Sequence, residues 1–319
     1  MAMRSKIQNY QWWDDRNVPP TTPKIVVNSI DNDLFRTPKS IYDYFDANMQ
    51  GCEEYKRKIA VAVWSAVNKR IRNHFLVIGE SGCGKTEIFR ILKRVYKNVV
   101  IFDSSNSNPK SYKGTNCLSD AFSDIDPTKP SFVIFDEFDK CLSKGNNGDL
   151  GYMMQVECLK FLEGDEPIYG GSDRDPRRID VSLSSLFFVG AFSALKKNRK
   201  SCLGFGNSID VSKDEPITFD DVIKSGTLTN EFVGRLQSVI QLPAMNNERA
   251  MQIIRDPRYS PVGKLSNQYG IRIDISDEKV IELASDVEKY GIRQVYSKLN
   301  EIISDSLFDD PDISTININ

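Results

Sequence analysis

Three glycines, a lysine and a threonine follow a short apolar run at a spacing that suits phosphate binding. Residues 75–78 (FLVI) are strand-forming, and they lead directly into Gly79-x4-Gly84-Lys85-Thr86. Glycines let the backbone turn so that its N–H groups point inward around a phosphate chain, at the positive end of the following helix. Lysine would reach the β and γ phosphates, and the threonine hydroxyl would bind Mg²⁺. The pattern predicts a P-loop whose nucleotide-binding residues are Gly79, Glu80, Ser81, Gly82, Cys83, Gly84, Lys85, Thr86 and Glu87.

Two adjacent carboxylates end a second apolar run. Residues 131–135 are apolar apart from the first, and Asp136 and Glu137 follow them. An apolar strand of this kind is buried on both faces, as in a parallel sheet, and its carboxyl end opens on the ligand crevice. Asp136 would hold the Mg²⁺ ion with Thr86, and Glu137 would orient an attacking water. The plainer alternatives are an ordinary glycine turn and a strand that ends in solvated acids, but the apolar runs flanking the P-loop argue against them.

The elements that must position these groups are indicated by hydrophobic periodicity. Apolar residues recur with helical spacing after the P-loop, at Ile88, Phe89, Ile91, Leu92 and Val95. A long helix that begins near Cys52 is predicted from the apolar face of Ile59, Val63, Ala66, Val67 and Ile71. Further strands are predicted at 99–103 and 185–192, a short helix at 117–122 and a longer helix at 152–162.

Strands that alternate with helices after a P-loop predict an α/β fold with a doubly wound parallel sheet. The pattern becomes mainly helical from about residue 243. It predicts helices at 248–254, 277–290 and 293–308, a strand at 271–275 and an edge strand over 313–319. We therefore expect an extended N-terminal arm (1–36), a large ATP-binding domain (37–243) and a smaller, mainly helical C-terminal domain (244–319).

Composition narrows the class of protein. The 319 residues are 40% hydrophobic and 27% charged, with a formal net charge of −2, which is typical of a globular chain and argues against a nucleic-acid binder. The six cysteines are scattered singly, and the one histidine, His74, excludes a histidine-based metal site or a Ser-His triad. No apolar run has membrane-spanning length and the N-terminus does not resemble a signal peptide, so we expect a cytoplasmic protein.

With these motifs placed, the chain resembles the ClpX-like AAA+ ATPases of the Clp/HslU group of protein unfoldases, from about Thr37 to the C-terminus. The resemblance extends beyond the P-loop to four segments in the family's order: 134–140, 190–192, 230–236 and 290–293. It implies a homohexameric ring that hydrolyses ATP with Mg²⁺ between subunits. Lys85 and Glu137 would act in catalysis with Arg235 of the neighbouring subunit, while Arg293, Met49 and Gln50 would contact the nucleotide within their own subunit.

The resemblance also implies two loops that contact other proteins. Tyr112 and Lys113 occupy the place of the family's pore loop, whose aromatic residue grips a translocating polypeptide. Leu203-Gly204-Phe205 stands where ClpX proteins carry the loop that docks on a ClpP-type peptidase. The chain would then unfold protein substrates by threading them, and it would be able to feed such a peptidase.

Several departures from the family pattern are evident. The cysteine spacing provides no counterpart of the family's N-terminal zinc-binding domain, so substrate recognition would differ or use Trp12 and Trp13 in the arm. Lysine replaces valine at position 113, and residues 144–149 match the basic second pore loop poorly. No asparagine or threonine marks the polar sensor residue after the strand at 185–192, where Ser193 is the nearest polar candidate.

Two alternative functions also use ATP hydrolysis, but they differ in the molecule on which the protein acts. A ring that acts on nucleic acid, or as a loader, would use the basic clusters at 174–178 and 196–200. The net charge and Tyr112 argue against that alternative. A nucleotide-gated scaffold would remodel one partner without threading it, and a variant at Tyr112 would distinguish it from an unfoldase.

Overall fold

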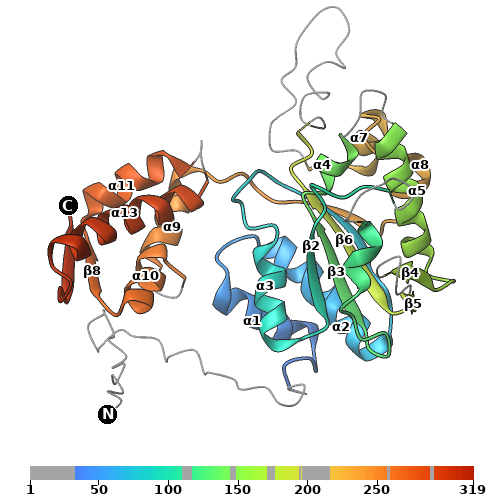
Figure 1. Ribbon diagram of the computed structural model, residues 1–319, viewed down its shortest axis with the longest axis horizontal. Helices are drawn as coiled ribbons and strands as arrows, with labels where there is room; N and C mark the ends of the chain where they lie inside the picture. The colour runs from blue at the N-terminus through green and yellow to red at the C-terminus, as the bar shows by residue number, and fades with distance from the viewer. Residues whose placement is uncertain are drawn as a thin grey trace, which may run out of the picture.

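The computed structural model describes residues 33–109, 117–143, 149–170, 177–193, 195, 216–256, 259–287 and 291–319. These form two lobes, which we call the sheet lobe (33–243) and the C-terminal lobe (244–319). A linker without regular secondary structure joins them (Figure 1). Trp12, Trp13, Tyr112, Lys113 and the 203–205 segment lie outside the described residues, as do 196–200 and most of the 174–178 cluster.

A five-stranded parallel sheet forms the centre of the sheet lobe, in the order β2-β3-β6-β1-β7. Its strands are β1 (His74–Ile78), β2 (Val99–Asp103), β3 (Ser131–Asp136), β6 (Ser184–Gly190) and β7 (Ser238–Gln241). The predicted α/β fold is confirmed. The strand before the P-loop and the strand before the carboxylates are not neighbours, because β6 lies between them. Their carboxyl ends nevertheless reach the same edge of the sheet, where a ligand crevice is expected.

Alternating side chains of the strands enter two separate cores. Phe75 and Val77 face one core, whereas Leu76 and Ile78 face the other. The first core is covered by α1 (Pro38–Asn48), α2 (Glu53–Lys69) and α3 (Glu87–Val95). The second lies under η1 (Leu118–Phe122), α4 (Phe138–Leu142), α5 (Asp149–Glu163), α7 (Phe219–Lys224) and α8 (Asn230–Val233), which lie on the opposite side of the sheet in Figure 1. A short antiparallel pair, β4 (Ile168–Gly170) and β5 (Arg177–Ile179), adjoins this layer.

The C-terminal lobe has a hydrophobic core of its own, built from residues between 245 and 318. Its elements are α9 (Asn247–Arg255), α10 (Pro261–Tyr269), β8 (Arg272–Ile275), α11 (Asp277–Ser285), α13 (Arg293–Asp309) and β9 (Thr315–Ile318). β8 pairs with β9 in parallel, which confirms the predicted strands. The division into domains after residue 243 stays a prediction, although the separate core supports it. Within the ranges given above, no helix combines the length and apolarity that a membrane span requires.

Some predicted element boundaries are wrong. α2 ends at Lys69, and Ile71 is 53% exposed rather than part of the helix's apolar face. The helix predicted over 277–290 is described as α-helix only to Ser285, and the short helix after Cys117 is a 3₁₀ helix. Among the described elements, eight were not predicted: α1, α4, β4, β5, α7, α8, β7 and α10. One of them, α1, carries a recognisable start signal. Thr37 accepts a hydrogen bond from the Ser40 N–H, and proline follows it at the first helical position.

The single histidine has a structural role. His74 is buried at the start of β1, and its Nδ1 accepts a hydrogen bond from the Leu186 N–H at 3.3 Å. Burial is the main cause that lowers the pKa of His74 to about 3, with a smaller contribution from the charge of Arg72. The imidazole is therefore neutral at physiological pH and serves β1–β6 pairing.

The two lobes meet backbone to backbone at a pair of glycines. A Cβ added at Gly291, at the start of the segment leading into α13, would lie 3.2 Å from the Ser81 carbonyl oxygen and 3.4 Å from Gly82 Cα in the P-loop. Gly291 also has φ +75°, which disfavours any L side chain. The contact therefore requires glycine for two independent reasons, and it places the C-terminal lobe directly on the loop.

Gly291→Ala should loosen this contact between the lobes. Gly270→Ala is the matched control, because Gly270 has φ +71° but nothing lies within 4 Å of an added Cβ. We expect both variants to lose roughly 1 kcal/mol of stability from the strained backbone. Only Gly291→Ala should also increase the radius of gyration in small-angle X-ray scattering. Equal scattering from the two variants would mean that the glycine contact does not hold the lobes together.

Candidate functional site

The P-loop has the backbone geometry that its glycine spacing predicts. Gly82 and Gly84 have φ of +79° and +97°. A Cβ at Gly84 would lie 3.0 Å from the Met49 methyl carbon, and one at Gly79 would lie 2.6 Å from Cys83 Sγ. Side chains are thus excluded by conformation at two of the glycines and by close packing at the third. With no side chains at these positions, an anion can approach the backbone of the loop closely.

Lys85 is held on the loop that precedes it. Its Nζ donates to the carbonyl oxygens of Gly79 and Glu80, both at 2.6 Å. Behind the loop, the Tyr55 hydroxyl donates to the Lys85 carbonyl oxygen. Burial raises the pKa of Tyr55 well above its usual value, so this hydroxyl stays protonated and remains a donor. The loop carbonyls therefore hold the ammonium, and Tyr55 holds the backbone of the same residue.

The P-loop threonine and the first carboxylate meet across the intervening strand. Thr86 Oγ1 donates to Asp136 Oδ2 at 2.9 Å. These are the two oxygen ligands that the sequence predicts for Mg²⁺. The described residues contain no cluster of three His, Cys, Asp or Glu side chains that would hold a metal ion. An ion bound by Thr86 and Asp136 would therefore complete its shell with phosphate oxygens and water, as is usual for Mg²⁺.

Glu137 adopts an unfavourable backbone conformation beside this pair. Its φ and ψ are 54° and 33°, in the left-handed region, at the residue before α4. Its Oε2 accepts a hydrogen bond from Lys140 Nζ at 2.7 Å, and this bond raises the pKa of the lysine. Strain of this kind at a charged residue is a feature of functional sites. The backbone turn directs Glu137 away from the strand axis and onto the wall of the cavity.

The end of β6 contributes backbone rather than the predicted polar side chain. Gly190 and Ala191 line the cavity, whereas Ser193 is exposed and lies outside its lining. Asp139 in α4 accepts a hydrogen bond from the Phe192 N–H at 3.0 Å, and Phe192 itself has φ +45°. Asp139 is the polar side chain that the structure places at the end of this strand, and it was not predicted.

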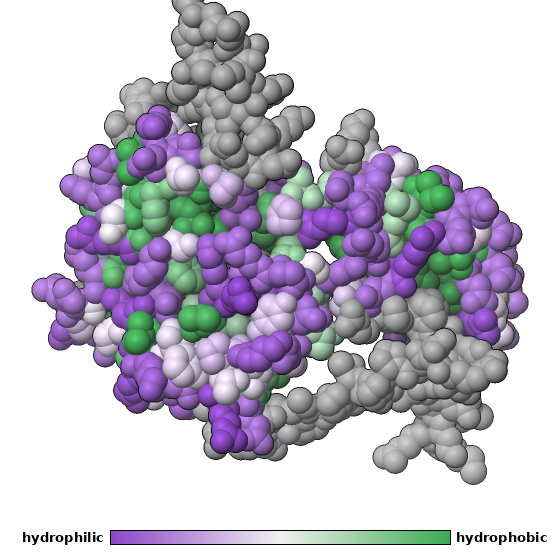
Figure 2. Space-filling model, turned by 180° about the vertical axis from the view of Figure 1, so that it is seen from behind, coloured by the Kyte–Doolittle hydropathy of each residue, from purple (hydrophilic) through white to green (hydrophobic). Residues whose placement is uncertain are grey.

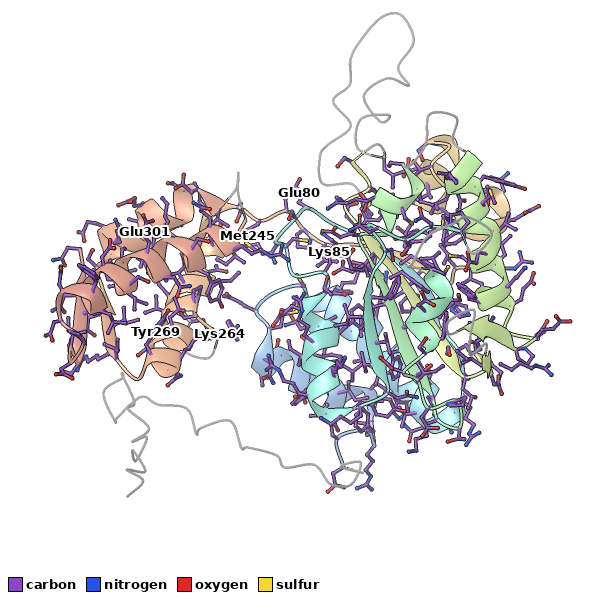
Figure 3. The ribbon with its side chains drawn as sticks, viewed as in Figure 1. Glu80, Lys85, Met245, Lys264, Tyr269 and Glu301 are labelled. Atoms are coloured by element: carbon purple, nitrogen blue, oxygen red, sulfur yellow. The ribbon has the colours of Figure 1, made fainter. Side chains whose placement is uncertain are left out.

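The site is a cavity of about 460 Å³ between the two lobes, a volume in the usual range for small-molecule sites. Figure 2 shows the gap between the lobes, bordered mainly by hydrophilic residues. In Figure 3, Lys85 lies at the edge of the sheet lobe toward Met245, and Lys264 lies on the side of the C-terminal lobe that faces the sheet lobe. The predicted site residues that line the cavity are Met49, Gln50, Ser81, Gly82, Cys83, Gly84, Lys85, Thr86, Glu87, Asp136, Glu137 and Arg293.

Of the predicted site residues that the structure describes, three do not line the cavity: Gly79, Glu80 and Arg235. Gly79 and Glu80 contribute through the carbonyl groups that hold Lys85. Arg235 follows α8 and forms an ion pair with Glu163 at the end of α5, and its Nη1 donates to the Glu231 carbonyl oxygen at 3.2 Å. Its side chain is 38% exposed.

Apart from Arg293, the residues that the C-terminal lobe adds to the cavity were not predicted. They include Arg249, Ile253, Tyr259, Lys264 and Tyr296. Arg249 Nη1 donates to the carbonyl oxygens of Pro243 and Ala244 at 2.9 and 3.0 Å, and its Nη2 donates to Cys52 Sγ at 3.2 Å. This side chain therefore connects α9, the linker between the lobes and the turn before α2. In the sequence, Arg249 is recognisable only as a residue in the first turn of a capped helix. That position does not indicate a function.

The arrangement fits a nucleoside triphosphate with Mg²⁺. It offers a glycine cradle that side chains cannot enter, a lysine at its rim and a threonine beside a carboxylate. A second carboxylate stands close by, and the opposite wall includes Arg293 and the aromatic residues Tyr259 and Tyr296. The amide oxygen of Gln50, also on the wall, is buried without a hydrogen-bond partner among the described residues. Each of these features matches a part of a nucleotide.

Comparison with known proteins agrees with the motifs. No protein-family model matches the chain. The chain is similar to the ATP-dependent Clp protease ATP-binding subunit ClpX 2 of Wolinella succinogenes, at 25% identity over 310 residues. The match covers 86% of this chain and 78% of that protein. Together with the parallel sheet and the P-loop, this similarity confirms the predicted resemblance to the ClpX-like AAA+ ATPases.

Proposed function

We propose that this protein is an ATPase that unfolds or remodels other proteins, in the manner of ClpX. It would assemble as a hexameric ring, bind ATP with Mg²⁺ between subunits and thread polypeptide through the ring. The observation that carries the proposal is the single cavity that unites Lys85, Thr86, Asp136, Glu137 and, from the other lobe, Arg293. Phosphate binding, metal binding, activation of water and contact between the lobes would then all depend on one bound nucleotide.

Each residue of the cavity has a separate task in this proposal. The P-loop N–H groups and Lys85 bind phosphate oxygens, and Thr86 and Asp136 bind Mg²⁺, which when present neutralises charge on those oxygens. Glu137 orients and deprotonates the attacking water. In the structure its carboxylate is held by Lys140 at 2.7 Å. We expect that bond to open before Glu137 reaches the water, because the bond from Lys140 occupies one of the carboxylate oxygens.

Arg293 would connect the bound nucleotide to the orientation of the lobes. It is the first residue of α13, two residues beyond the Gly291 contact with the P-loop. A guanidinium at this position would bind phosphate when the cavity is filled and lose that contact after hydrolysis. The resulting movement of the C-terminal lobe would be the motion that the ring passes on to its substrate.

Arg235 would act on the nucleotide of the neighbouring subunit. It lies outside the cavity lining of its own chain, and its partner in the structure is Glu163. A half-exposed ion pair of this kind contributes little stability, so it can be exchanged at small cost for a stronger bond to phosphate. Charge that develops on the transferring phosphoryl group would be stabilised by the incoming guanidinium.

The action of Arg235 between subunits can be tested with mixed rings. Arg235→Ala and Glu137→Gln rings should each lose ATP turnover by about 10³-fold or more, because each lacks one essential group. In an equal mixture about a quarter of the interfaces would pair an intact Glu137 with an intact Arg235, and turnover should partly return. Mixing Arg235→Ala with the doubly substituted chain is the control and should restore nothing. Verified mixed rings that stay inactive would refute the arrangement between subunits.

Tyr112 and the Leu203-Gly204-Phe205 segment complete the proposal as contacts with other proteins. Both lie outside the described residues and rest on their place in the family pattern. An aromatic ring suits a loop that must grip any sequence, since it offers a large contact area at low entropic cost. A loop with two exposed apolar side chains suits docking, since six copies on one ring increase a weak contact through effective concentration.

Two variants separate these roles from each other and from hydrolysis. Tyr112→Ala should keep ATP turnover within about twofold and abolish the unfolding of a fluorescent substrate protein, because the loop transmits force without contacting phosphate. Phe205→Ala should keep both and lose only degradation by an added ClpP-type peptidase. Unfolding by Tyr112→Ala at the parent rate would favour a nucleotide-gated scaffold over a threading enzyme. Undiminished degradation by Phe205→Ala would remove the docking role.

A further inference from the structure

The segment that carries Arg235 is short and depends on its surroundings. Arg235 comes shortly after α8, a helix of four residues that ends at Val233. A single helical turn is not stable by itself, because forming the first turn fixes several residues for one hydrogen bond. The backbone position of Arg235 is therefore set by the contacts that the rest of the sheet lobe makes with α8 and with the residues on either side of it.

Gln155 of α5 holds the chain just ahead of α8, and the two helices lie side by side (Figure 1). Its Oε1 accepts a hydrogen bond from the Thr229 N–H at 2.7 Å, and its Nε2 donates to the Thr227 carbonyl oxygen at 3.4 Å. Thr229 is the N-cap of α8, and its own side chain accepts from the Phe232 N–H. Gln155 is only 6% exposed and both ends of its amide are engaged, so it fixes the point at which α8 begins.

Other contacts hold α8 from below and behind. Phe232 is fully buried, and its ring stacks on that of Phe138 in α4, with the ring centroids 5.8 Å apart. After Arg235, the Gln237 N–H donates to the His74 carbonyl oxygen at 2.8 Å, at the start of β1. The backbone around Arg235 is thus held on all sides by the sheet lobe.

The side chain of Arg235 is held less firmly than its backbone. It forms an ion pair with Glu163 at the end of α5, and the two side chains are 38% and 47% exposed. An ion pair as exposed as this contributes little, because water and salt screen it. A fixed backbone with an exchangeable side chain suits a group that must meet a ligand outside its own chain, since little remains to be ordered when the ligand is reached.

The exact position of this backbone matters for the task proposed for Arg235. A guanidinium stabilises the charge on a transferring phosphoryl group through hydrogen bonds of fixed length and direction. Displacement of such a group by about 1 Å can slow a reaction about 10²-fold. The loss would appear in kcat rather than in the KM for ATP, because the contact is made in the transition state.

We propose that Gln155 is a positioning residue for ATP hydrolysis in the neighbouring subunit: by fixing the start of α8, it places Arg235 at the phosphates that the next chain binds. The proposal rests on the proposed function, because it assumes that Arg235 acts between subunits. Gln155 does not line the cavity of its own chain. Its substitution should therefore spare the site of its own subunit and weaken the site of the next.

The test replaces Gln155 by methionine, which has a similar length and volume but forms neither hydrogen bond. We expect Gln155→Met rings to keep the KM for ATP within about twofold and to lose kcat by roughly 10²-fold. In an equal mixture with Glu137→Gln chains, about a quarter of the interfaces pair an intact Glu137 with a well-placed Arg235, so turnover should partly return. In a mixture with Arg235→Ala chains no interface has both, so turnover should stay low.

The two mixtures give the reverse result if Gln155 serves the site of its own subunit. A Gln155→Met chain with a damaged cavity and a well-placed Arg235 would restore turnover with Arg235→Ala chains, but not with Glu137→Gln chains. That result would overturn the proposal. Parent-level turnover by Gln155→Met alone would overturn it too, and so would a lack of recovery in both mixtures.

Asn98→Leu is the matched control for the loss of a bridging amide. Asn98 Oδ1 accepts from the Asp126 N–H at 2.9 Å, and its Nδ2 donates to the Asp126 carbonyl oxygen at 3.0 Å, in the turn that precedes β3. Its substitution should lower the melting temperature as Gln155→Met does, but it should keep kcat within about twofold. An equal loss of turnover in the two variants would mean that turnover follows stability rather than the position of Arg235.

A second variant and a reference mixture complete the test. Gln155→Asn keeps the amide but shortens its reach by one methylene, and it should give the same pattern of recovery if Gln155→Met chains do not assemble. The reference is the mixture of Arg235→Ala with Glu137→Gln. If that mixture regains nothing, action between subunits fails and both proposals fall together. If it regains turnover while the Gln155 variants with Glu137→Gln do not, the role of Gln155 alone is wrong.

Discussion

The hydrogen bond between Thr86 and Asp136 joins two parts of the chain that the sheet itself keeps apart. β6 separates the strand before the P-loop from the strand before the carboxylates, so neither motif can reach the other through strand pairing. The contact forms because all five strands are parallel and end at the same edge. The two apolar cores fix the level of those ends, since they bury alternate residues of the central strands. A shift of β3 by one residue would exchange its two faces and remove Asp136 from Thr86.

Beyond that edge, the site depends on how the C-terminal lobe meets the sheet lobe. Gly82 and Gly291 bring two backbones into contact, and Arg249 ties the linker to the turn before α2. Glu137 and Phe192 follow the carboxyl ends of β3 and β6, and both have left-handed backbone conformations. Such conformations are strained for residues other than glycine. The parallel strands thus place the P-loop and the two carboxylates at one edge, and the contacts with the C-terminal lobe bring in the rest of the cavity wall.

The sequence was sufficient to predict motifs that consist of neighbouring residues. The P-loop, the carboxylates after β3 and the five buried positions of α3 were all predicted, because local spacing determines them. It was insufficient for groups that meet only after folding. Arg249 reaches a cysteine 197 positions away, and Asp139 of α4 accepts a bond from the backbone just after β6, whereas Ser193, the nearest polar candidate in the sequence, lies outside the cavity lining. Element ends such as Ile71 were also missed, since helical periodicity continued past the point where the left-handed residue Arg70 ends α2.

The central claim is that the cavity hydrolyses ATP only when a second copy of the chain completes it. The most direct measurement is ATP turnover per chain over a range of protein concentrations, with the state of assembly followed in parallel by sedimentation velocity. We predict that dilute single chains bind ATP with almost no turnover, and that turnover per chain rises as rings form, because Arg235 is supplied by the neighbour. Full turnover by single chains, unchanged across the range, would contradict this account.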